Sequence, residues 1–233
     1  MKDQNIPVIT IDGPSGAGKG TIAQMLALNL KWNILDSGAL YRTLAYFMIS
    51  KKIGISEFEK NKDLIKKNFI VKFDPGTLGE PVKVIFNEKD ITSEVRTEKI
   101  AKRTSNLAAD YKIREFIKPC QREFMSAPGL IADGRDMGTV IFPDSFLKIF
   151  LTASLEERAK RRQLQLKRQG LEVKMRVLLQ ELEERDEKDI HREISPLKPA
   201  EDSVIIETTN LEPKTVLEKI KEVYKKRINK NVS

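Results

Sequence analysis

The chain has 233 residues, a formal net charge of +8 at pH 7 and a hydrophobic fraction of 40%. This composition excludes a disordered chain, the lack of an apolar run of about 18 residues excludes a transmembrane helix, and the single cysteine excludes an internal disulfide. The basic charge favours an anionic partner, such as a phosphorylated small molecule, nucleic acid or a membrane surface. No signal-like segment precedes the first predicted strand, and we expect a cytoplasmic protein with one α/β core.

A glycine-rich segment follows the first predicted strand, Ile6–Asp12, and opens an amphipathic helix. It reads Gly13-Pro14-Ser15-Gly16-Ala17-Gly18-Lys19-Gly20-Thr21. Such a loop directs unpaired backbone N–H groups toward one point at the positive end of the helix, and its glycines let phosphate oxygens approach closely. Lys19 adds a mobile charge for the β- and γ-phosphates. The segment therefore predicts a nucleoside triphosphate site. Gly20 stands where the general pattern has Ser or Thr, which argues against a hydroxyl ligand for magnesium at that position.

The next elements continue a β-α-β pattern and then change character. Residues 33–36 form a short predicted strand, and a helix follows through residue 47. Phe69, Val71 and Phe73 then alternate with polar residues, as do Val82, Val84 and Phe86, which predicts an antiparallel hairpin around a Pro/Gly-rich turn. Residues 91–92 could add a third short strand. The alternation predicts a small antiparallel insertion in the parallel core.

The second half of the chain returns to alternating helices and strands. We predict a helix at residues 98–109, a second helix through Ile113, Phe116, Ile117 and Phe124 that is kinked or interrupted near Pro119, and strands at residues 130–133, 146–151 and 203–207. Ser154 and Glu157 have the spacing of a capping box that opens a basic helix, and Thr215 and Glu218 have the same spacing near a terminal helix at residues 213–227. This order favours a parallel sheet covered by helices.

Three further segments carry groups that could bind a second substrate. Asp36, Ser37, Tyr41 and Arg42 lie at a strand-to-helix junction. Asp133 ends another buried strand and Arg135 and Asp136 follow it, at the end of the sheet where open α/β proteins bind ligands. Arg185, Asp189 and Arg192 have the spacing that places them on one face of a helix.

Four of these segments together resemble the bacterial cytidylate kinases, in the same order and across nearly the whole chain. The segments are GPSGAGKGT, LDSGALYR, IADGRDMGTVIFP and ERDEKDIHREISPLKPA. The resemblance implies a nucleoside monophosphate kinase fold with a five-stranded parallel sheet, and transfer of the γ-phosphoryl group of ATP to CMP or dCMP. Gly20 also belongs to the family pattern. The implied cofactor is Mg²⁺ bound with ATP, and its direct protein ligands stay undetermined.

The resemblance also implies roles for individual residues. Residues 13–21 would hold the ATP phosphates, with Lys19 acting in catalysis. Arg42 and Arg135 would clamp the CMP phosphate, while Asp136, Ser37 and Arg114 would contact the cytosine ring. Sugar contacts would come from Ser105 and Asp189, with Arg185 between sugar and phosphate. The remaining residues in the expected CMP site are Asp36 and Tyr41.

The basic run that begins at Arg158 resembles the family's lid over ATP, in which Arg158, Arg161 and Arg162 would stabilise the transferring phosphoryl group. Alternatively, the run is a solvated helix face or a weak nucleic-acid patch. The implied division is a core of residues 1–36, 97–152 and 171–233, a CMP-binding region of residues 37–96, and a lid of residues 153–170.

Two other functions stay open at this point. A P-loop kinase could act on UMP or another small phosphate acceptor, and a non-catalytic nucleotide switch or nucleic-acid-binding module would also use the basic charge. The paired Arg and Asp loops at two strand ends favour the kinase. We therefore expect ATP and CMP or dCMP as partners, no nucleic acid or membrane, and a monomer.

Overall fold

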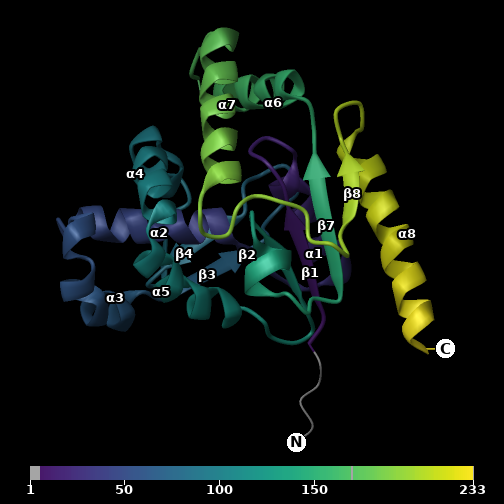
Figure 1. The fold of residues 1–233 in the computed structure, drawn as a ribbon, viewed down its shortest axis with the longest axis horizontal. Helices are drawn as coiled ribbons and strands as arrows, with labels where there is room; N and C mark the ends of the chain where they lie inside the picture. The colour runs from purple at the N-terminus through teal and green to yellow at the C-terminus, as the bar shows by residue number, and fades with distance from the viewer. Residues whose placement is uncertain (1–5, 169, 233) are drawn as a thin grey trace, which may run out of the picture.

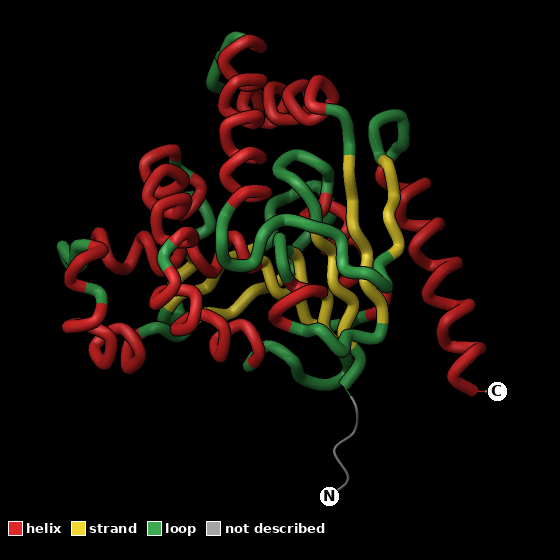
Figure 2. Tube along the Cα trace, in the orientation of Figure 1, coloured by secondary structure: helices red, strands yellow, loops and turns green. Residues whose placement is uncertain are grey.

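In the computed structural model, residues 6–168 and 170–232 are described, and they form a central parallel sheet with helices on both faces (Figures 1 and 2). The expected α/β fold with a five-stranded parallel sheet is confirmed, because the strands pair in the order β2-β6-β1-β7-β8 and every pairing is parallel. These strands are β1 (Val8–Asp12), β2 (Asn33–Asp36), β6 (Leu130–Asp133), β7 (Leu147–Thr152) and β8 (Val204–Glu207).

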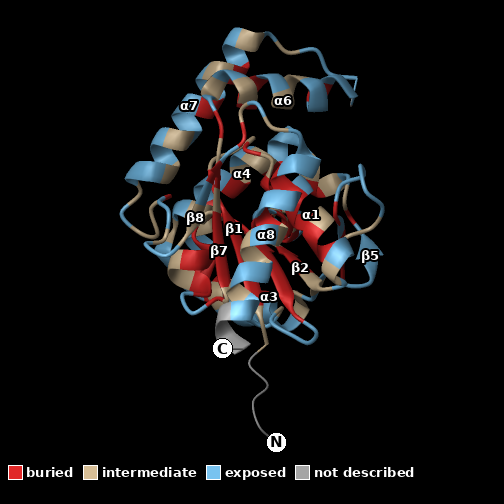
Figure 3. Ribbon diagram, turned by 90° about the vertical axis from the view of Figure 1, so that its right-hand side faces the viewer, coloured by how far each residue is buried: buried red, intermediate tan, exposed pale blue. Residues whose placement is uncertain are grey.

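The strands separate two layers of apolar side chains because successive residues point to opposite faces of the sheet. Val8 and Leu35 pack on the face covered by α2 (Ser37–Ser50), α4 (Glu98–Ala109) and α5 (Tyr111–Arg122). Ile9 and Ile34 pack on the face covered by α1 (Lys19–Leu30) and α8 (Pro213–Val232). Figure 3 shows the buried strands between these layers. None of the helices within residues 6–168 and 170–232 has the length and apolar character needed to cross a membrane.

The predicted insertion forms a separate three-stranded antiparallel sheet beside β2. Its strands are β3 (Val71–Asp74), β4 (Lys83–Phe86) and β5 (Lys89–Asp90), preceded by the short helix α3 (Lys62–Asn68) and the 3₁₀ turns Ile55–Glu57 and Glu59–Asn61. A third 3₁₀ turn, Glu94–Arg96, leads into α4. The third strand was predicted at residues 91–92 and lies two residues earlier. Asn87 and Glu88 both adopt positive φ, which makes a two-residue turn, so pairing resumes at once.

Two helices project beyond the carboxyl ends of the parallel strands (Figure 1). They are α6 (Leu155–Arg168) and α7 (Met175–His191), and Ala159, Leu166, Leu178 and Leu182 form a small core between them. The lid was expected to end at residue 170, yet α7 shares this core with α6. Gln169 lies outside the described residues.

Four smaller expectations about helices can be compared with the structure. Of the capping box predicted at Ser154, one hydrogen bond forms, because the Ser154 hydroxyl accepts from the Glu157 N–H. The Glu157 carboxylate does not complete the box and pairs with Arg161 instead. The helix with Pro119 runs on without interruption to Arg122. Thr215 is not an N-cap, because α8 already begins at Pro213, a residue suited to the first helical position. Arg192 lies just beyond the end of α7 and not on its face.

Candidate active site

The glycine loop connects β1 to α1 and wraps around the side chain of Lys19. Gly16 and Gly18 adopt left-handed φ values of 81° and 91°, which residues with a Cβ rarely adopt. At Gly13 a Cβ would lie 2.0 Å from the carbonyl oxygen of Leu151, so only glycine fits between β1 and β7. The Lys19 ammonium donates to the carbonyl of Pro14 at 2.8 Å. The predicted phosphate loop thus has the expected backbone shape.

Three carboxylates surround the buried end of this loop. Burial raises the pKa of Asp133 to about 7 despite the charge of Lys19, and burial together with the charge of Arg135 lowers the pKa of Lys19 to about 7. An ideal Cβ at Gly20 would lie 3.4 Å from a carboxylate oxygen of Asp133, so Asp133 is next to the space that a Ser or Thr side chain would fill. Asp36 and Asp12 complete the group.

Asp12 connects the phosphate loop to the loop that follows β6. It is the last residue of β1, and its two carboxylate oxygens accept from the backbone N–H groups of Met137 and Gly138 at 2.9 and 2.8 Å. Burial raises its pKa to about 6, against the effect of both hydrogen bonds. Met137 directly follows Asp136, so Asp12 fixes the backbone beside that carboxylate. Sequence reasoning missed this role, although a carboxylate that ends a buried strand indicates a need for N–H partners.

A buried polar cluster is built around an ion pair between Arg114 and Asp136. The Arg114 guanidinium donates to the Asp136 carboxylate, and the two side chains are only 8% and 5% exposed. Tyr41 is buried beside them, and that burial raises the pKa of its hydroxyl to about 12. The structure therefore brings Arg114, Asp136 and Tyr41 together.

Ser37 is buried at the start of α2, where its hydroxyl accepts from the side-chain amide of Gln121 at 2.8 Å. The preceding residue, Asp36, caps this helix by accepting from the Ala39 N–H at 2.8 Å. Sequence reasoning missed Gln121, and its signal was a polar residue on the apolar face of a helix. Ser105 is exposed on α4, and the described contacts do not join it to these residues.

A cluster of arginines lies near both the Arg114–Asp136 pair and Lys19, because Arg192 is close to Arg114 and Arg135 is close to Lys19. Arg135 donates to Asp189 at 3.0 Å, and Arg42 donates to the carbonyl of Val95 at 3.3 Å. Arg185 stays open to solvent, yet the surrounding protein and the charge of Arg135 lower its pKa to about 10. Burial lowers the pKa of Arg42 and of Arg192, and neighbouring arginines add to both effects.

This cluster holds more positive than negative charge. Burial alone would raise the pKa of Asp189, but the charges of Arg135 and Arg185 outweigh it and lower that pKa. One Arg192 nitrogen, Nη2, is buried without a hydrogen-bond partner. Depressed guanidinium pKa values and an unpartnered donor both indicate a site that an anion would complete. Arg192 was noted in the sequence but not assigned to the site.

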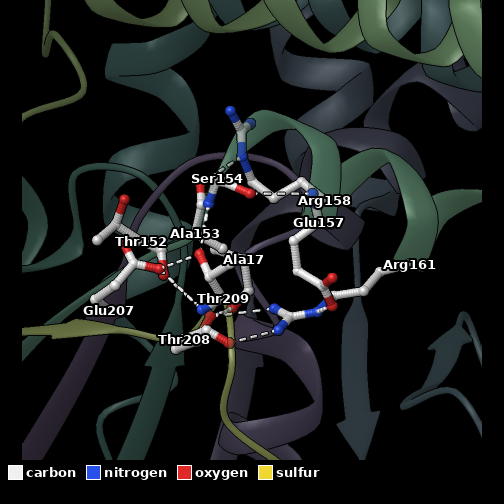
Figure 4. A network of polar contacts seen from close by, with 10 residues as sticks. All are labelled: Ala17, Thr152, Ala153, Ser154, Glu157, Arg158, Arg161, Glu207, Thr208 and Thr209. Carbon is white, nitrogen blue, oxygen red and sulfur yellow. Dashed lines mark hydrogen bonds and ion pairs between the residues drawn. The ribbon is translucent and has the colours of Figure 1, made fainter.

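The three predicted lid arginines lie at different distances from the phosphate loop. Arg158 is buried against it and donates to the carbonyl of Ser15 at 3.2 Å, while Asp186 pairs with the same nitrogen at 2.5 Å. Arg161 donates to the hydroxyl and the carbonyl of Thr208, and Figure 4 shows this contact beside Ala17. Arg162 contacts Gln165 within its own helix. The N-terminal half of α6 therefore contacts the phosphate loop and its neighbour Thr208, whereas Arg162 faces the space between α6 and the insertion.

That space is an open cavity of about 740 Å³ between α6 and the residues that lead from the insertion into α4. Its lining includes Arg96, Glu98 and Arg162. The phosphate loop, the arginine cluster and the Arg114–Asp136 pair all lie near the carboxyl ends of β1, β2 and β6. A parallel sheet places ligands at this edge.

The arrangement has counterparts in known proteins. A family model described as "Cytidylate kinase" matches residues 9–226. A cytidylate kinase of Pseudomonas paraeruginosa is 46% identical over 215 residues, which cover 92% of this chain and 93% of that protein. A cytidylate kinase of Shewanella baltica is 49% identical over 206 residues, which cover 88% of this chain and 89% of that protein. On this evidence, and in agreement with the resemblance seen in the sequence, the chain belongs to the cytidylate kinase family.

Proposed function

We propose that this protein transfers the γ-phosphoryl group of ATP to CMP or dCMP, which yields ADP and CDP or dCDP. The observation that carries the choice of base is the buried Arg114–Asp136 pair. A carboxylate accepts from the exocyclic amine of cytosine, and a guanidinium donates to the ring nitrogen and carbonyl next to it. Uracil presents a carbonyl where cytosine has the amine, and that oxygen would face the carboxylate of Asp136. This contrast favours CMP over UMP as the acceptor.

The arginine cluster supplies a place for the acceptor phosphate. Arg42 and Arg135 can each pair with two phosphate oxygens, and Arg192, which has an unpartnered donor, shares Asp189 with Arg135. Asp189 and Arg185 lie on α7 beside Arg135, and we propose that they contact the ribose or deoxyribose. Ser105 stays a predicted sugar contact that would need α4 to approach the substrate.

The donor phosphates fit the glycine loop, and no protein base is needed for the transfer. The attacking group is an anionic oxygen of the CMP phosphate, so the protein's task is to align two phosphates and to stabilise negative charge between them. Lys19 would leave the Pro14 carbonyl for the β- and γ-phosphates. Arg158, Arg161 and Arg162 would come from α6, and their closure would exclude water from the site.

Mg²⁺ is the metal that this chemistry calls for, and the residues present fit a loosely held ion. Residues 6–168 and 170–232 contain no group of three His, Cys, Asp or Glu side chains that could bind a metal by itself. Asp133 is the carboxylate beside Gly20, where it could hold a water of the hydrated ion. Mg²⁺ retains water readily and is commonly held through substrate phosphates. When bound, it would neutralise charge on the β- and γ-phosphates.

We also propose the implied division into core, CMP-binding region and lid, with a monomer acting in the cytoplasm. The small core that α6 and α7 share supports movement of the lid relative to the central sheet. The basic charge is explained by two polyphosphate substrates, so we propose no role for nucleic acid or a membrane.

Product identification tests this function. Incubation of the protein with ATP, Mg²⁺ and CMP should yield ADP and CDP in equal amounts, separated and measured by anion-exchange chromatography. A nucleotide switch or nucleic-acid-binding module would form no CDP. ADP without CDP would indicate hydrolysis and would contradict the proposal.

The pKa of Lys19 gives a second prediction, because ATP binding should take up a proton. Lys19 is largely neutral in the free protein above pH 7, and the triphosphate would favour its charged form. Between pH 8 and 9 we expect proton uptake on binding, with an affinity for ATP that falls as the pH rises. Calorimetry in buffers of different ionisation enthalpy measures this uptake, and Lys19→Met should abolish it. The same uptake in both proteins would contradict this assignment.

A further inference from the structure

Three backbone carbonyls of the hairpin loop converge on one side chain of α1. The side-chain amide nitrogen of Gln24 donates to the carbonyl of Pro75 at 2.6 Å, to that of Glu80 at 2.9 Å and to that of Thr77 at 3.1 Å. Gln24 is only 4% exposed and lies five residues after Lys19. A loop of the insertion is thereby attached to the helix that carries the phosphate-binding lysine.

The chemistry of this contact is unusual, because an amide NH₂ group has two N–H donors for three acceptors. The loop holds its carbonyls inward with the help of Gly76 and Gly79, which adopt φ values of 59° and 95°. The rest of the loop faces solvent, and Leu78 is 54% exposed. Gln24 therefore supplies a buried anchor for a loop that is otherwise exposed.

A chain of contacts leads from this anchor to the proposed phosphate clamp. Val82, two residues after Glu80, is buried in the same apolar cluster as α1. Its carbonyl accepts from Arg96 at 3.1 Å. The carbonyl of the neighbouring residue, Val95, accepts from Arg42 at 3.3 Å. A chain of contacts thus joins the hairpin loop on α1 to the backbone that holds Arg42.

We propose that Gln24 is a positioning residue, which ties the insertion to the P-loop helix and so holds Arg42 in place for the phosphate of CMP. The proposal rests on the proposed function, because it assigns Arg42 to the acceptor phosphate. Gln24 does not touch either substrate. Its loss should therefore weaken the use of CMP and leave the use of ATP almost unchanged.

Two substitutions separate hydrogen bonding from packing. Gln24→Met keeps the size of the side chain and removes the donor, whereas Gln24→Lys supplies an ammonium with three N–H donors for the three carbonyls. We expect Gln24→Met to raise KM for CMP roughly ten-fold, the equivalent of about one lost hydrogen bond, with KM for ATP and kcat within about two-fold of the original. Gln24→Lys should restore KM for CMP. Asn29→Leu, at an exposed amide on the same helix, is the matched control and should have no effect.

Hydrogen exchange of residues 76–80 provides a readout that needs no substrate. Gln24→Met should speed exchange in this loop, and Gln24→Lys should return it to the original rate. Three results would each overturn the proposal. The first is an unchanged KM for CMP in Gln24→Met, and the second is a fall in kcat together with an equal rise in KM for CMP and for ATP. The third is a Gln24→Lys variant with the same KM for CMP as Gln24→Met. Failure of the unaltered protein to form CDP would instead overturn the proposed function and the assignment of Arg42 with it.

Discussion

Replacing Lys19 with methionine should lower kcat by about 100-fold or more, because a charge that follows the transferring phosphoryl group acts mainly in the transition state. Methionine keeps the length and apolar volume of the side chain, and Lys19 is buried, so the phosphate loop should keep its shape. The measurement is steady-state ADP formation with saturating ATP and CMP.

Lys219→Met is the control for this substitution, because Lys219 is exposed on α8 and far along the chain from the phosphate loop. It should leave kcat unchanged. Turnover of Lys19→Met within a few-fold of the original would show that Lys19 has no part in stabilising the transition state, and the role given to this residue would be wrong.

Replacing Asp136 with alanine should have the second large effect, on both the choice of base and stability. Without the carboxylate, the exocyclic amine of cytosine has no acceptor, and the carbonyl of uracil no longer faces a negative charge. The ratio of kcat/KM for CMP to that for UMP should therefore fall roughly ten-fold or more. Arg114 would also be left as an unpaired buried charge, which typically costs about 3–5 kcal/mol. Steady-state rates with each nucleotide and a thermal melt measure the two effects.

Two further variants make the test of Asp136 specific. Asp202→Ala removes a half-exposed carboxylate that pairs with Lys148, and it should keep the preference for CMP. The double variant Arg114→Met/Asp136→Ala should be more stable than Asp136→Ala alone, because it leaves no unpaired buried charge. If the ratio of kcat/KM for CMP to that for UMP is unchanged in Asp136→Ala, Asp136 does not contact the base and the assignment is wrong.

The fold could be predicted largely because its signals are local. The glycine loop follows from the backbone needs of Gly13, Gly16 and Gly18, and the strands follow from runs of β-branched residues. The errors also have local causes. Because the turn at Asn87 and Glu88 is only two residues long, the third strand of the insertion begins earlier in the chain than predicted. Pro119 lies in the last turn of α5, so it interrupts little of the helix.

The site was only partly predictable because its contacts join residues far apart in the chain. Arg135 and Asp189 are 54 positions apart, and Gln24 contacts a loop 51 to 56 positions away. No spacing rule reports such pairs, and only the fold brings them together. Asp12 illustrates the same limit, since its partners, the N–H groups of Met137 and Gly138, belong to the backbone and leave no trace in the sequence.

The most direct test of the central claim, that this protein is an ATP-dependent kinase for CMP or dCMP, is a coupled assay of ADP release with four acceptors. With saturating ATP and Mg²⁺, kcat/KM should be high for CMP or dCMP and at least ten-fold lower for UMP and for AMP, whose adenine has no carbonyl for Arg114. Equal rates with all four acceptors, or a preference for UMP or AMP, would contradict the assignment.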